Sequence, residues 1–142
     1  MNARTARDRS PGFTLIEILL VMAILGLMLS VTLPISYDMY RSYKASLRAE
    51  EVMMVVSGLK RESFLYNERK ILTSENGVMR VNGEEKTISE AQIRIDTPIE
   101  FYKNGTTSGG ILTVVTGNQV YEVQVQAPLG NLSLERKGEQ RS

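Results

Sequence analysis

Residues 13–33 form an apolar run, FTLIEILLVMAILGLMLSVTL, that contains one ionisable side chain, Glu17. At 1.5 Å per residue, a helix of this length measures roughly 31 Å, which matches the hydrocarbon core of a bilayer. The preceding residues 1–12 carry three arginines against one aspartate, and no comparable basic cluster follows the run immediately. This asymmetry predicts a single-pass membrane protein whose N-terminus is cytoplasmic and whose remaining chain lies across the membrane.

Three kinds of segment fit this pattern. A secretory signal peptide would place small residues at a cleavage site after the run, but Ser30-Val31-Thr32 is a poor match and the run is too long. An uncleaved signal anchor explains the charge and the length. It does not explain a carboxylate near the start of the run, or a glycine between the arginines and the helix. The third interpretation takes Gly12-Phe13-Thr14-Leu15-Ile16-Glu17 as one motif, with a small residue, an apolar stretch and an acid at fixed spacing.

The segment PGFTLIEILLVMAILGLMLS resembles the class III signal of type IV pilins and type II secretion pseudopilins. The resemblance implies that a prepilin peptidase cuts between Gly12 and Phe13, removes residues 1–12 as a leader and methylates the new amino group of Phe13. The acid of the family motif corresponds to Glu17, and the proline that bends the family's helix corresponds to Pro34. The motif covers roughly residues 11–34, and the rest of the chain resembles the family only in architecture.

Glu17 also stands out on physical grounds. A carboxylate within a membrane helix costs on the order of 2.5 to 3.5 kcal/mol on insertion scales, so it is expected to have a cationic partner. Cleavage before Phe13 would create an α-amino group with a pKa near about 8, within one helical turn of Glu17. In the resembled family, the proposed partner is that amino group on a neighbouring subunit. The alternative is that Glu17 sits in the headgroup layer near the start of the helix.

Pro34 is the next residue with a mechanical consequence. Proline has no N–H to donate to the carbonyl four residues back, at Ser30, and its ring disfavours a straight helix. The residue predicts either a helix kink or the point at which the helix leaves the membrane, and the sequence does not separate the two.

Beyond Pro34 the pattern predicts a domain at 34–142. A helix is expected at about 35–66, an antiparallel sheet at about 70–136 and a polar tail at 137–142. Apolar or small residues recur at three- and four-residue steps along the helix and predict a face that packs on the sheet: Ala45, Ala49, Val52, Val56, Leu59, Ser63 and Tyr66. The expected fold class is α+β. Together with the N-terminal resemblance it implies a pilin-like fold, a long helix packed on an antiparallel sheet, with this domain in the periplasm.

Turn residues divide the second half of the chain into short segments of period two. The predicted strands are 71–73, 78–81, 92–96, 99–103, 111–116, 120–126 and 132–136. The first two flank Ser74-Glu75-Asn76-Gly77, a hairpin signal, and Pro98 separates the third strand from the fourth. Residues 110–136 resemble the C-terminal module of H-type minor pseudopilins. The chain lacks an obvious acidic calcium loop and the C-terminal cysteine pair of many pilins, which favours a minor pseudopilin.

Composition removes several other classes of function. The chain has no cysteine and no histidine, which excludes thiol nucleophiles, disulfides, histidine bases and Ser-His-Asp triads, and its net charge is +1. We therefore expect no enzymatic activity, no cofactor and no metal. The resemblance implies a structural subunit of the type II secretion pseudopilus. Its partners would be other pseudopilins or pilins, the prepilin peptidase, the inner-membrane assembly platform and inner-membrane lipid.

The sequence leaves two alternatives open. One is a minor pilin of a type IV pilus, and the other is a minor pilin that captures DNA through Arg136, Lys137 and Arg141. Glu135 and Glu139 lie among these cations and argue against a nucleic-acid partner.

Overall fold

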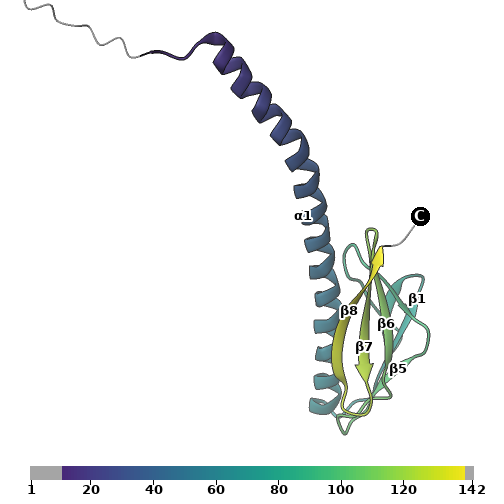
Figure 1. Cartoon of the computed structure of the whole chain (residues 1–142). Helices are drawn as coiled ribbons and strands as arrows, with labels where there is room; N and C mark the ends of the chain where they lie inside the picture. The colour runs from purple at the N-terminus through teal and green to yellow at the C-terminus, as the bar shows by residue number, and fades with distance from the viewer. Residues whose placement is uncertain (1–10, 140–142) are drawn as a thin grey trace, which may run out of the picture. The chain divides into compact units, whose positions relative to one another are not determined.

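A computed structural model describes residues 11–139 and shows one long helix followed by eight strands (Figure 1). The chain divides into two compact units, one ending at Met39 and one beginning at Tyr40. Helix α1 (Leu15–Leu65) contributes its first half to the N-terminal unit and its second half to the C-terminal unit.

The N-terminal unit consists of the apolar part of α1. Its helix continues through Pro34 without interruption. Two polar side chains in this part satisfy their hydroxyl groups within the helix. Ser30 donates to the carbonyl of Leu27 at 2.7 Å, and Thr32 donates to that of Met28 at 2.8 Å. The helix therefore carries few unpaired polar groups into an apolar environment.

The C-terminal unit contains two antiparallel four-stranded sheets. Sheet A has the strand order β3-β2-β1-β5 and sheet B the order β4-β6-β7-β8. The strands of sheet A are β1 (Lys70–Glu75), β2 (Val78–Val81), β3 (Glu84–Lys86) and β5 (Ile99–Phe101). Those of sheet B are β4 (Gln92–Ile95), β6 (Gly110–Thr116), β7 (Gln119–Gln126) and β8 (Asn131–Glu139).

Sheet A begins with two tight turns of the same kind. Asn76-Gly77 joins β1 to β2, and Asn82-Gly83 joins β2 to β3. All four residues have positive φ, between 52° and 84°. Asparagine and glycine tolerate this left-handed conformation. A two-residue turn built from it has a backbone twist that matches the twist of the flanking strands. The predicted hairpin at residues 71–81 is thus confirmed, with a shorter turn than expected.

The hydrophobic core lies between α1 and the inner faces of the sheets. Six of the seven predicted helix residues are buried: Ala45, Ala49, Val52, Val56, Leu59 and Ser63. Along β7 the burial alternates, with Tyr121, Val123 and Val125 inside, as the period of two predicts. The largest fully buried side chain is Phe101 of β5.

Tyr66, the seventh residue, was predicted to face the sheet, but its side chain is 69% exposed. The helix ends at Leu65, and Asn67 adopts a positive φ of 52°. The amide of Glu68 then donates to the carbonyl of Ser63 at 3.1 Å, which closes the helix end. The chain turns away before Tyr66 can reach the core.

The sequence predicted one sheet, and the structure has two. Pro98 explains the difference, because it cannot donate to a strand ladder and so interrupts the segment 92–101. The part before it, β4, pairs with β6, and the part after it, β5, pairs with β1. A backbone hydrogen bond still joins the two sheets near Ile93, whose amide donates to the carbonyl of Gly77 at 2.8 Å.

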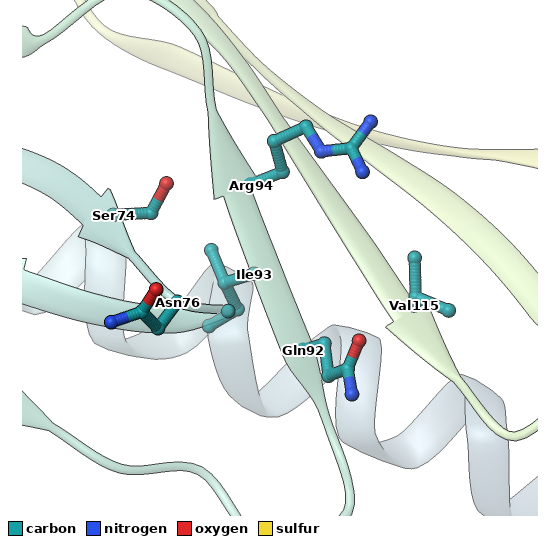
Figure 2. A pocket seen from close by; sticks show the side chains of 7 residues that line it. Ser74, Asn76, Gln92, Ile93, Arg94 and Val115 are labelled. Carbon is teal, nitrogen blue, oxygen red and sulfur yellow. The ribbon is translucent and has the colours of Figure 1, made fainter.

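A shallow hollow lies along this junction (Figure 2). Ser74 and Asn76 of the β1–β2 hairpin lie on the side of β4 opposite to Val115, and the Ser74 hydroxyl accepts a hydrogen bond from the amide of Ile95 at 2.7 Å. Arg94 is the one ionisable residue among the seven that line the hollow, and it points away from the hairpin. The Ser74 hydroxyl thus joins the two sheets at this hollow.

The last strand is longer than predicted. Residues 137–139 were expected in a polar tail, but β8 extends to Glu139 and pairs with β7 along its length. Tyr121 pairs with Arg136 and the neighbouring Val120 with Gly138, so Lys137 is an extra residue that forms a β-bulge. The bulge keeps the two strands paired beyond the point where the apolar alternation ends.

Candidate assembly site

The residues singled out at the N-terminus lie at the beginning of α1. Gly12, Phe13 and Thr14 precede the helix, which starts at Leu15. The backbone amide of Glu17 donates to the Thr14 hydroxyl at 3.2 Å, and the amide of Ile18 donates to the Thr14 carbonyl at 3.2 Å. Thr14 is therefore the N-cap of the helix, and Glu17 occupies the third helical position.

Thr14 is a site residue that the sequence reasoning missed. Its signal was present, because threonine followed three residues later by glutamate, ahead of an apolar run, is the pattern of a capping box. A negative charge in the first turn is also favoured by the partial positive charge of the helix N-terminus. The cap thus fixes where the helix begins and places the Glu17 carboxylate in its first turn.

Glu17 makes no ion pair with any other residue among 11–139. The side chains around it are apolar and exposed, with Phe13, Leu15 and Ile16 each more than 70% accessible. An unpaired carboxylate on an apolar helix is unfavourable in the hydrocarbon core of a membrane.

The apolar helix has the dimensions of a membrane span. It contains an 18-residue window with a mean hydropathy of 2.6, and none of that window is buried within the protein. A core helix of a soluble protein would bury much of this surface, so the exposed apolar surface needs lipid or other helices around it.

The candidate DNA contacts do not form a free basic patch. The Lys137 ammonium lies 3.2 Å from a carboxylate oxygen of Glu135 and 3.3 Å from one of Glu122. Hydrogen bonds raise the pKa of Lys137, and the bond to Glu135 has a larger effect than the bond to Glu122. Arg136 is exposed on β8, and Arg141 lies outside the described residues. Within residues 11–139, no group of three or more acidic side chains is placed to hold a metal ion.

The comparisons with known proteins bear on the same N-terminal segment. Residues 7–33 match the prokaryotic N-terminal methylation motif. This motif implies a type IV pilin-like protein that is processed by a prepilin peptidase and assembles with other pilins. Together with the apolar helix it indicates anchoring in the inner membrane. No curated protein and no solved structure matches the chain.

Proposed function

We propose that this chain is a minor pseudopilin, most similar to the H type, of a type II secretion pseudopilus. Its periplasmic domain would begin at residue 34 and its membrane helix would span residues 13–33. In this role the protein is a structural subunit whose activity is polymerisation. The observation that carries the proposal is the capped start of an exposed apolar helix, whose Glu17 makes no ion pair within residues 11–139.

The mechanism follows from the position of the cut. Cleavage between Gly12 and Phe13 would remove the basic leader and leave a cationic amino group at the end of the helix, which methylation at Phe13 retains as a cation. In a staggered stack of subunits, the amino group of one chain can reach Glu17 of the next. The carboxylate that is unfavourable in an isolated chain is then neutralised only when a subunit is correctly docked.

Pro34 has a separate part in the proposal. The helix is continuous at this residue, but the carbonyl of Ser30 has no N–H donor four residues ahead. A helix weakened at one position can bend when neighbouring subunits pack around it. We propose that Pro34 allows such bending during assembly.

The processing step is tested by mass spectrometry of the membrane fraction. The mature chain is expected to begin at Phe13, with a methylated amino group. Gly12→Ala should still be processed in part, whereas Gly12→Leu should accumulate as the uncut form, since the peptidase pocket must admit the residue before the cut. Gly26→Leu is the matched control, because both glycines have open space at their Cβ positions. A mature chain that begins at any other residue would disprove the motif assignment.

Deletion of the gene in its native bacterium separates a pseudopilin from a pilus subunit. Loss of secreted enzymes from the medium, with surface pili and twitching retained, is expected for a pseudopilin. Loss of pili with normal secretion would instead assign the protein to a type IV pilus. Complementation with the Glu17→Ala variant shows whether the phenotype depends on the proposed assembly site.

A further inference from the structure

A groove lies between the second half of α1 and the last strand of sheet B, which run side by side (Figure 1). It has a volume of about 390 Å³ and is lined by Met53, Met54, Ser57, Gly58 and Arg61 of α1 and by Leu132 of β8. Apart from its chain neighbours and the adjacent backbone of its own helix, no heavy atom lies within 4 Å of the position that a Gly58 Cβ would occupy. The glycine therefore leaves an open notch beside two flexible methionines, a surface that adapts to an apolar side chain.

The strand that borders this groove has a free edge. β8 is the last strand of sheet B, and within residues 11–139 its outer edge makes no backbone hydrogen bond to another segment. Natural proteins usually protect such edges with charges or bulges, because unpaired N–H and C=O groups readily accept another strand.

Only part of the β8 edge is protected in this way. The later half carries three consecutive charged residues, 135–137, and the bulge at Lys137. The first half, Asn131-Leu132-Ser133-Leu134, has neither a charge nor a bulge. This unprotected half contains Leu132 and is therefore the part that borders the groove.

The groove also carries an unpaired cation. Arg61 is exposed and makes no ion pair within the described part of the chain. It lies one helical turn beyond Gly58, roughly 4.5 Å along the helix axis. Two residues of an extended strand span about 6.6 Å and place their side chains on the same face. When a bound strand places an apolar side chain in the notch, the side chain two positions further along that strand can therefore contact Arg61.

We propose that residues 131–134 of β8 and this groove bind an extended segment of a partner protein by strand addition. The bound strand would place an apolar side chain in the notch at Gly58 and a carboxylate, two residues away, against Arg61. The backbone would provide the affinity and the two side chains the specificity. This surface belongs to the C-terminal unit and does not depend on Glu17, so it goes beyond the proposed assembly function.

The test uses the full chain in detergent micelles with a probe strand fused behind Ser142. A six-residue Gly-Ser linker is followed by Thr-Val-Thr-Leu-Thr-Glu-Thr, in which Leu and Glu share one face. Tethering raises the local concentration of the probe to the millimolar range. Hydrogen exchange by mass spectrometry is expected to slow at least tenfold in peptides that cover β8. Unchanged exchange in β8 would overturn the proposal.

Matched changes in the probe test the mode of binding. A split probe, Thr-Val-Thr-Leu-Glu-Thr-Thr, has the same composition but places Leu and Glu on opposite faces in every register, and a probe with prolines at alternate positions lacks the necessary donors. Both should leave β8 unprotected. Equal protection by either would mean nonspecific contact and would overturn the proposal.

Changes in the groove test its two specific contacts. Gly58→Leu should fill the notch and abolish most of the protection. Arg61→Glu should do the same, and a probe with Lys in place of Glu should restore it. The control is Lys86→Glu, which makes the same change from a positive to a negative charge at an exposed residue of β3. Protection that survives both groove changes would contradict the proposal. Concentration-dependent protection of β8 in the untethered chain would identify a second copy as the occupant and would likewise overturn it.

Discussion

The backbone amide of Glu17 donates a hydrogen bond to the side-chain hydroxyl of Thr14 at 3.2 Å. This one contact determines two features of the N-terminus. It marks the end of the non-helical residues 11–14, and it holds the first helical turn that carries the carboxylate. Residues 11–14 are not helical, so the bond between Gly12 and Phe13 lies just outside the helix.

Removal of the cap should loosen the start of the helix. Thr14→Ala deletes the hydroxyl, and an N-cap of this kind is worth about 1 kcal/mol, which corresponds to roughly fivefold in an opening equilibrium. Amide exchange at Glu17 and Ile18, whose N–H groups bond to Thr14, should accelerate in micelles by that factor, while exchange at Val52 stays unchanged. Thr14→Ser keeps the hydroxyl and should behave as the native chain does. Equal exchange in the Ala and Ser variants would show that the cap has no effect on this helix.

Glu17→Ala should be processed normally but should assemble poorly. The change removes an unfavourable group from the membrane helix and also removes the proposed partner of a neighbouring amino group. Mass spectrometry should show the mature chain, and crosslinking in the membrane should show at least a tenfold loss of adducts with other pilin-like subunits. Glu50→Ala, at an exposed glutamate in the second half of α1, is the control. Native levels of both crosslinking and secretion in Glu17→Ala would refute the assembly role.

A buried chain of hydrogen bonds fastens α1 to the β6–β7 hairpin. The Tyr121 hydroxyl donates to Oε1 of Gln119 at 2.7 Å, and Nε2 of Gln119 donates to the Ser42 hydroxyl at 2.7 Å. Gln119 and Tyr121 are 3% and 5% exposed. Gln119→Ala should therefore destabilise the protein by about 1 to 3 kcal/mol, because it leaves a buried hydroxyl unpaired.

Thermal unfolding in detergent, followed by near-ultraviolet circular dichroism, measures this effect. Tyr121→Phe should also cost about 1 to 3 kcal/mol, since it keeps the packing but leaves the buried Oε1 of Gln119 without its donor. Tyr43→Phe, at a tyrosine that is 64% exposed, should change little. A double-mutant cycle of Gln119→Ala with Ser42→Ala is expected to show a coupling of at least about 0.5 kcal/mol. Strict additivity would mean that the bond to the helix contributes nothing.

Local periodicity predicted the parts of the fold that depend on neighbouring residues. The helix face from Ala45 to Ser63 follows a period near 3.6, and the hairpins follow from pairs such as Asn76-Gly77, so both were visible in the sequence. The short strand β3 was missed, because its three residues are all charged and exposed. Nothing local marks such a segment as a strand, and only its pairing with β2 makes it one.

The remaining features arise from contacts between distant segments. Division into two sheets depends on which strands β4 and β5 find as partners, and the bulge at Lys137 depends on the register of β8 against β7. The groove at Gly58 exists because a helix residue and Leu132 are brought together across more than seventy positions of sequence. The capping box at Thr14 was readable in principle, since its pattern is local.

Acid should weaken the attachment of the loop that follows β3. Glu90 lies 2.8 Å from the Lys44 ammonium and 3.7 Å from Arg48, whose guanidinium also pairs with Glu51. The hydrogen bond and the charge of Lys44 hold the pKa of Glu90 below its ordinary value of 4.5. A lowered native pKa stabilises the folded state above the unfolded pKa, and that stabilisation is lost as the pH falls through the native pKa.

The unfolding midpoint should therefore drop as the pH falls below 4.5, and Lys44→Met should reduce that drop. Thermal scans of both proteins at pH 7 and at successively lower pH would measure it. Lys86→Met serves as the control, because Lys86 makes no ion pair within residues 11–139. Identical pH dependence in the native and Lys44→Met proteins would contradict the assignment of the effect to this pair.

Binding to DNA should be absent near physiological salt. The DNA alternative needs Arg136, Lys137 and Arg141 to contact phosphates, and three such contacts would give a log-log salt slope near −2.7, at about −0.9 per contact. Lys137 is already bound by Glu122 and Glu135, so contact with a phosphate would require it to give up two carboxylates. The net charge of +1 supplies no further attraction. Electrophoretic retention of short duplexes by the full chain in micelles, at low salt and at about 0.15 M, checks this expectation. A shift at 0.15 M that disappears when all three cations are replaced by alanine would overturn the secretion role in favour of DNA uptake.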